Sequence, residues 1–179
     1  MSRHTFNTTD LNNAPVMVIV GFDNPTESLF FQVHREGEIA EASIAMPEVE
    51  FDSVGLFKTL NGLGVALPVE IINTLAFESM FGGSNETRTW PDHAKSEVEK
   101  ALISAGLIQN MSCSLPSPSK CQWVLIGQDK DQYTIHFDEK HEVFIPHRLL
   151  TDEQAAVGAH VGSEKLLALL TAENLVKTS

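Results

Sequence analysis

The sequence predicts an α+β fold: a mostly antiparallel sheet built from two β-meanders, each followed by helices packed on one face. Two observations predict this class. Short apolar runs separated by turn residues occur in two places, at 16–45 and at 122–145, and such runs are typical of antiparallel strands. After each of them, apolar residues recur at the spacing of an amphipathic helix.

The first meander is centred on a predicted hairpin. Residues 16–20 form an unbroken apolar run rich in β-branched side chains, which favours a central strand covered on both faces. Residues 21–25 supply turn chemistry, and 29–33 are predicted to form the returning strand. The charged segment 35–38 makes the next turn, and a third strand is predicted at 39–44.

Helices are predicted after this meander. The first begins at Asp52 or Ser53, whose side-chain oxygen can cap it, and it ends at Gly62. Pro68 suits the first position of the second helix, which ends at the glycine-rich segment 82–85. The predicted inward face of this second helix consists of Ile72, Leu75, Ala76 and Met80.

The second half repeats this organisation. A third helix is predicted at 94–105 and a short strand at 107–111. Three further strands are predicted at 123–126, 133–137 and 142–145. Thr151 and Gln154 form a capping box before C-terminal helices. The recurrence fits an internal duplication, but two independent uses of the common strand–turn–strand pattern are the favoured interpretation.

These elements divide the chain into three parts. Residues 1–15 are polar and are predicted to be a flexible N-terminal arm. Residues 16–111 carry the first meander and its helices, and 112–179 carry the second meander and the C-terminal helices. A loop at 112–120, rich in Ser and Pro, joins them. Because this linker is short, we expect one compact unit of two halves.

Charge is the most informative bulk property. The net charge is −12 and the pI is about 4.9. Such a charge argues against direct binding to nucleic acid or to anionic membranes, both of which attract Lys and Arg. Between residues 36 and 87, nine acids face one base, Lys58. An uneven surface of this kind can steer a basic partner, although acidic residues also serve solubility.

The acidic residues of the first half supply the predicted binding face. Its members lie in the meander and in the connection that follows it: Glu36, Glu38, Glu41, Glu48, Glu50 and Asp52. We therefore expect an acidic, non-enzymatic interaction module with a basic protein partner. Its sharpest form is an inhibitor or regulator that occupies the basic site of a nucleic-acid-binding protein.

The sequence contains no G-x-S-x-G, H-E-x-x-H or P-loop motif, so we assign no catalytic residue, metal or cofactor. The alternative is a small enzyme or a ligand- or metal-binding domain that uses histidines and cysteines. Its candidate residues are His34, His136, His141, Cys113 and Cys121. Two cysteines do not make a disulfide framework in a chain of this length, so free thiols and a cytoplasmic location are expected.

Two aromatic residues flank the glycine-rich segment 82–85. Phe81 precedes it and Trp90 follows it. Exposed, they would indicate a contact site; buried, they would anchor the loop to the core.

Overall fold

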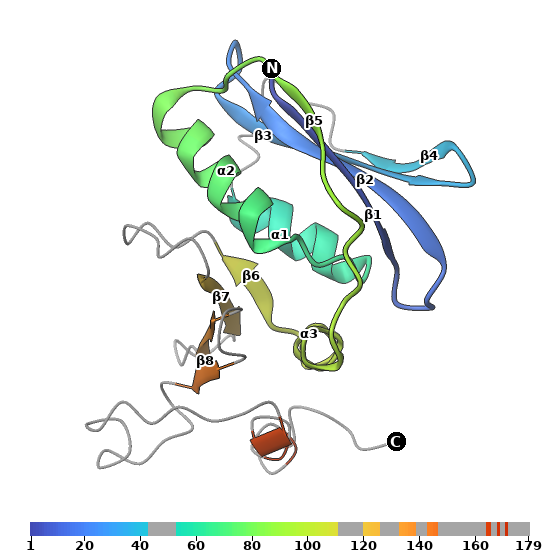
Figure 1. Ribbon diagram of the computed structural model, residues 1–179, viewed down its shortest axis with the longest axis vertical. Helices are drawn as coiled ribbons and strands as arrows, with labels where there is room; N and C mark the ends of the chain where they lie inside the picture. The colour runs from blue at the N-terminus through green and yellow to red at the C-terminus, as the bar shows by residue number, and fades with distance from the viewer. Residues whose placement is uncertain are drawn as a thin grey trace. The chain divides into compact units, whose positions relative to one another are not determined.

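The computed structural model describes residues 1–42 and 53–110, the strands at 120–125, 133–138 and 143–146, and the helical residues 164, 165, 168 and 171 (Figure 1). The chain forms two units, Met1–Lys95 and Ser96–Ser179. The sequence places its boundary later, after residue 111. The predicted α+β class is confirmed by a mixed five-stranded sheet and the helices that accompany it.

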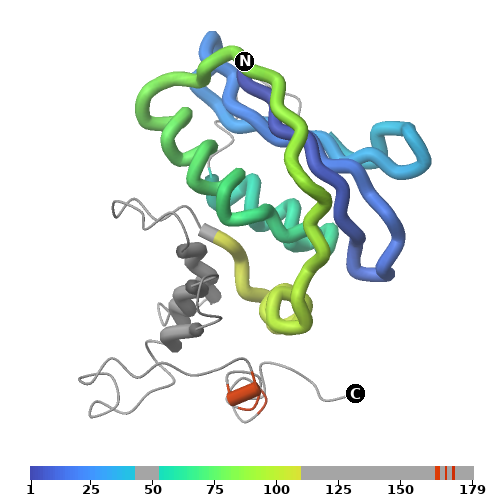
Figure 2. Tube along the Cα trace, viewed as in Figure 1, coloured from blue at the N-terminus to red at the C-terminus, as the bar shows by residue number. Residues whose placement is uncertain are grey.

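The five-stranded sheet of the first unit has the order β4-β3-β2-β1-β5. Its strands are β1 (Arg3–Thr9), β2 (Pro15–Asp23), β3 (Ser28–Arg35), β4 (Glu38–Ala42) and β5 (Thr87–Thr89). The first four strands pair with their neighbours antiparallel, whereas β5 lies parallel to β1. Figure 2 traces the segment after α2 as it returns alongside β1.

The prediction of a flexible arm at 1–15 is wrong for residues 3–9, which form β1. His4, Phe6 and Thr8 are buried in alternation with more exposed neighbours, as expected for a strand with one covered face. The sequence hides this alternation because two of the three inward residues are polar. Strand β1 therefore belongs to the sheet, directly beside β2.

Strand β2 is the central strand that the apolar run predicts. Val18, Val20 and Phe22 are buried on one face, and Ile19 is buried on the other. Two helices, α1 (Ser53–Gly62) and α2 (Val69–Phe81), cover one face of the sheet (Figure 1). Val20 lies on this face, because it is opposite His4, which contacts Glu78 of α2. The core lies between these helices and the sheet.

The predicted inward face of α2 is confirmed at Ile72 and Leu75, half-buried at Ala76 and wrong at Met80. The buried residues are Val69, Ile71, Ile72, Leu75 and Glu78. Met80, which the sequence places inward, is 64% exposed. The reason lies at Glu78, because a carboxylate can face inward where polar groups receive it. Ser2, just before β1, and His4, on β1, provide these groups, so Glu78 faces the sheet.

The β3–β4 hairpin turns within two residues. Arg35 pairs with Glu38, and the two residues between them have positive φ: 50° at Glu36 and 83° at Gly37. Positive φ at both central positions is the signature of a type I′ turn. Beyond it, β4 is exposed along most of its length. Figure 1 shows the tip of this hairpin standing apart from the β1–β2 hairpin.

The second unit contains α3 (Glu97–Ser104) and a four-stranded antiparallel sheet. A capping box of Ser96 and Glu99 starts the helix, later than the predicted start at 94. The sheet has the order β6-β7-β8-β9, with β6 at Ile108–Asn110, β7 at Lys120–Leu125, β8 at Tyr133–Asp138 and β9 at Val143–Pro146. These strands overlap the four predicted ones. Residues 112–119 of the predicted linker loop and most of the predicted C-terminal helices lie outside the described residues, and residue 120 begins β7.

Among the described residues, no helix has both the length and the apolar character needed to cross a membrane.

Candidate functional site

Three of the six predicted acidic residues fall in the described part of the chain. Glu36, Glu38 and Glu41 lie on the β3–β4 hairpin, and all three are exposed. The other three, Glu48, Glu50 and Asp52, lie outside the described residues. Within the described part, no ion pair to Glu36, Glu38 or Glu41 is present. The hairpin therefore presents its negative charge to solvent.

Arg35, the basic residue of this hairpin, forms an ion pair with Asp10, which lies outside the hairpin. The Arg35 guanidinium lies 3.0 Å from the carboxylate of Asp10, which is nearly buried after β1. Burial of Asp10 acts to raise its pKa. Hydrogen bonds from the backbone N–H groups of Ala14 and Asn12, with the positive charges of Arg35 and Lys95, outweigh burial and lower that pKa below its ordinary value. Asp10 therefore stays ionised and offsets the charge of Arg35.

A second feature lies at the C-terminal end of α2. A pocket of about 520 Å³ opens between this end and the β2–β3 turn. Its lining combines apolar and polar groups: Phe22, Asn24, Glu27, Ser79, Met80, Phe81 and Gly82. A volume of this size accommodates a side chain or a small ligand.

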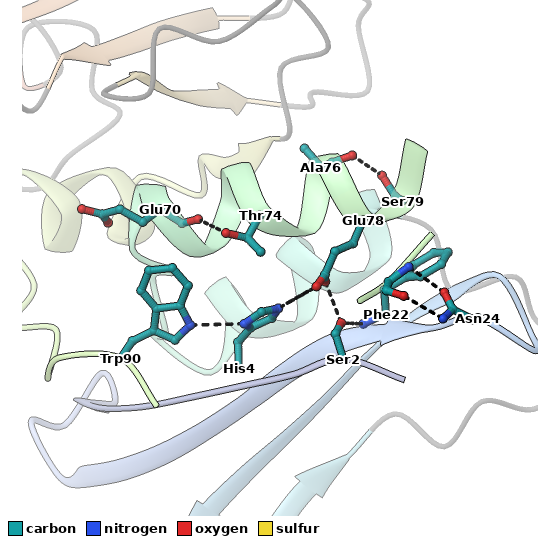
Figure 3. Close-up of polar contacts among 11 residues, drawn as sticks. Ser2, His4, Phe22, Asn24, Glu70, Thr74, Ala76, Glu78, Ser79 and Trp90 are labelled. Atoms are coloured by element: carbon teal, nitrogen blue, oxygen red, sulfur yellow. Dashed lines mark hydrogen bonds and ion pairs between the residues drawn. The ribbon is translucent and has the colours of Figure 1, made fainter. Parts of the chain in front are cut away.

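The two walls of this pocket are joined by hydrogen bonds. The Asn24 side chain accepts from the N–H of Gly83 at 2.6 Å and donates to the carbonyl of Gly83 at 2.9 Å (Figure 3). Its amide also donates to Asn85. A Cβ at position 83 would meet the Asn24 oxygen at 3.3 Å, so the close approach suits glycine. These bonds fix the loop after α2 against the β2–β3 turn, and the pocket is preformed.

Apolar side chains surround the pocket on the helix side. Phe77, Met80 and Phe81 are 62%, 64% and 69% exposed. They fall at i, i+3 and i+4 and therefore share one face of α2. The rings of Phe77 and Phe81 are in contact, with centroids 4.8 Å apart. This exposed cluster, together with the core residues of the opposite face, makes α2 apolar on two sides.

The pocket is electrostatically suited to a cation. Glu27, an acidic residue with φ of 49° in the tight β2–β3 turn, is one of the residues that line the pocket. The last carbonyl groups of a helix carry partial negative charge, and α2 has no basic residue in its last turn to balance it. Both features attract positive charge to the same place.

A buried polar network lies beneath α2. Glu78 accepts a hydrogen bond from the Ser2 hydroxyl at 2.6 Å and lies 3.2 Å from Nε2 of His4 (Figure 3). The Trp90 indole N–H donates to Nδ1 of His4 at 3.2 Å. Because Nδ1 accepts, Nε2 carries the proton that reaches Glu78. These bonds join β1 and the residue before it to α2.

The two aromatic residues around segment 82–85 have separate roles. Trp90 packs beside His4 and lies under the Arg88 guanidinium, 3.7 Å from the ring centroid, so it anchors the loop. Phe81 is exposed and belongs to the pocket rim. The anchor that the sequence offers is therefore found at Trp90, and the exposure of Phe81 leaves a contact site there a prediction.

Of the histidines and cysteines of the alternative function, His34 is the one whose side chain the structure describes. His34 is half-buried on β3, with Nε2 3.2 Å from the Gln32 oxygen. The backbone of His136 lies on β8 and that of Cys121 on β7. Cys113 and His141 lie outside the described part, within which no group of three or more His, Cys, Asp or Glu is arranged to hold a metal ion.

Sequence reasoning missed the pocket and the buried network. The signal for the pocket was the spacing of Phe77, Met80 and Phe81, which is a second apolar face on a helix that already has one. No comparable signal marks Ser2, His4 and Glu78, because their partners are distant in sequence.

Comparison of this chain with protein-family models, curated proteins and solved structures finds no match.

Proposed function

We propose that this protein is an acidic, non-enzymatic interaction module that binds a basic protein partner. The observation that carries the proposal is the β3–β4 hairpin, which exposes Glu36 in its turn and Glu38 and Glu41 on β4. Arg35, the base beside them, is paired with Asp10. The net charge of −12 supports the same partner class, since it raises the encounter rate with a basic protein.

The partner class we propose is a protein whose basic site normally receives nucleic acid. Carboxylates held on a rigid turn can take the place of phosphates, because both offer charged oxygen acceptors to Arg and Lys. The type I′ turn at Glu36 and Gly37 fixes the backbone that carries these carboxylates. Binding would then block the partner and regulate it.

The test is affinity capture with the full chain immobilised, at low and at high salt. We expect capture of basic proteins at low salt and their release at high salt, because exposed charges are screened. Duplex DNA added in solution should compete with the chain for the captured protein. Failure to retain any basic protein at low salt would contradict the proposal.

Two triple variants locate the site. Glu36→Gln, Glu38→Gln and Glu41→Gln together should reduce capture strongly. The matched control removes three exposed acids elsewhere: Glu70→Gln, Glu86→Gln and Glu97→Gln. Both variants change the net charge equally, so equal loss of capture would show that total charge, and not the hairpin, attracts the partner.

A further inference from the structure

We infer that the pocket at the end of α2 receives an arginine or lysine side chain of the basic partner, whose neighbouring apolar residues cover Phe77 and Phe81. This inference rests on the proposed function and adds to it a second contact, separate from the acidic hairpin. The pocket is lined by residues of the β2–β3 turn and of α2, whereas the hairpin belongs to β3 and β4.

The polar atoms of the pocket accept hydrogen bonds and have few donors left. Glu27 offers a carboxylate. The Ser79 hydroxyl donates to the carbonyl of Ala76 at 2.8 Å, which leaves its oxygen free to accept (Figure 3). The side-chain amide of Asn24 is already engaged with Gly83 and Asn85. Arg and Lys side chains carry donors and no acceptor, so they complement this lining.

The apolar part of the pocket fits the rest of such a side chain. Arg and Lys have aliphatic stems that pack on apolar surface while the charged head stays with polar partners. Phe22, Met80 and Phe81 provide that surface, and an aromatic face also attracts a cation. Outside the pocket, the Phe77–Phe81 pair offers exposed area that a second, apolar residue of the partner would bury.

Charge decides between a partner protein and a second copy of this chain. Two copies that met through this end would bring two Glu27 carboxylates and two helix C-termini together, each copy with a net charge of −12. Like charges at close range disfavour that contact. A basic segment would be attracted to this pocket, whereas a second copy of the chain would be repelled. For that reason we assign the pocket to the basic partner.

The experiment selects binders from a library of random short peptides displayed on phage, with the full chain as bait. We expect the recovered peptides to carry Arg or Lys beside an apolar residue. Phe81→Ala should weaken the binding of a recovered peptide by about tenfold, as for a central aromatic contact. Glu27→Gln should weaken it by about two- to fivefold, as for an exposed ion pair.

Matched controls separate the possible results. Leu11→Ala removes an exposed apolar residue elsewhere and should leave peptide binding unchanged. Replacing the peptide's Arg by citrulline removes the charge with little change in shape, and it should weaken binding to the native chain but not to the Glu27→Gln variant.

The results also distinguish failure of this inference from failure of the proposed function. If the hairpin triple variant weakens the binding of basic peptides and the Glu27 and Phe81 variants do not, the peptides do not use the pocket. That result would contradict the inference but would still support the proposed function. Recovery of no basic peptide would overturn both. Sedimentation that shows dimers of the native chain and monomers of the Phe81→Ala variant would instead assign the pocket to a second copy.

Discussion

The β3–β4 hairpin and the end of α2 are both exposed, but their chemistry is opposite. The hairpin presents Glu36, Glu38 and Glu41, whereas the end of α2 presents Phe77 and Phe81 beside a pocket. Charge acts across roughly 8 Å at physiological salt, while apolar surface contributes only on contact. The charged hairpin is therefore suited to steering a partner during approach, and the apolar end of α2 is suited to holding the partner once bound.

The two regions also differ in what supports them. The end of α2 is held by buried hydrogen bonds that Glu78 accepts and by the Asn24–Gly83 pair. The hairpin tip is a two-residue turn with exposed neighbours. Substitutions beneath α2 should therefore lower stability, and substitutions on the hairpin should change binding at nearly constant stability. The following predictions test this contrast.

The largest effect is expected from Glu78→Ala. The substitution leaves the Ser2 hydroxyl and the His4 Nε2–H buried without their acceptor, so the free energy of unfolding should fall by about 3 kcal/mol. Urea denaturation measures this loss. Glu70→Ala, on the exposed side of the same helix, is the control and should stay within about 0.5 kcal/mol of the native chain. A loss below about 1 kcal/mol for Glu78→Ala would mean that the network does not hold α2 to the sheet.

Asn24→Ala should follow, with a loss of about 1.5 kcal/mol, because it removes both hydrogen bonds to Gly83. The amide of Gly83 should also exchange faster with solvent, and binding of pocket peptides should weaken as the walls separate. Thr26→Ala, in the same turn, breaks only exposed contacts to Asp23 and Ser28 and is the control. Unchanged exchange at Gly83 would contradict the preformed pocket.

The fold was predictable wherever inward residues were apolar. The run at 16–20 has a single reading as a covered strand, and β2 confirms it. Strand β1 escaped prediction because His4 and Thr8 occupy inward positions, and hydrophobic alternation is the signal on which strand prediction depends. The inward face of α2 was predicted correctly at Ile72 and Leu75 but wrongly at its C-terminal end, since Glu78 lies inward and Met80 outward.

The candidate site was predictable only in part. Local sequence identifies the acidic hairpin, because turn chemistry and charge are both local properties. The pocket depends on Asn24 meeting Gly83 and on Glu27 lying near the end of α2. These contacts join residues more than fifty positions apart, and no periodicity in a single sequence encodes them.

Asp10→Asn should produce a smaller, pH-dependent effect. The folded chain lowers the pKa of Asp10 below its ordinary value of 3.8, so the carboxylate stabilises the fold above that pH and loses this contribution as the pH falls through the lower, folded value. The native chain should exceed the variant in stability by about 0.5 kcal/mol near neutral pH, as for a partly exposed ion pair with Arg35. Denaturation across the acid range measures the difference, which should shrink below about pH 4. A difference that is constant down to strong acid would remove Asp10 as the partner that neutralises Arg35.

Glu36→Asn is expected to cause the smallest change in stability and to separate stability from partner binding most clearly. Glu36 has φ of 50°, a left-handed conformation that Asn adopts more easily, and Asn-Gly is the favoured pair of a type I′ turn. The free energy of unfolding should therefore rise, by about 0.5 kcal/mol or less, while binding of the basic partner weakens because a carboxylate is lost. Glu36→Gln removes the same charge without easing the backbone, so it should weaken binding equally at native stability. If the two variants are equally stable, the turn stores no strain at this residue; if both bind the partner as the native chain does, Glu36 is not part of the acidic face. If Glu36→Asn is more stable than the native chain and binds the basic partner more weakly, then Glu36 strains the backbone of the turn and its carboxylate contributes to binding.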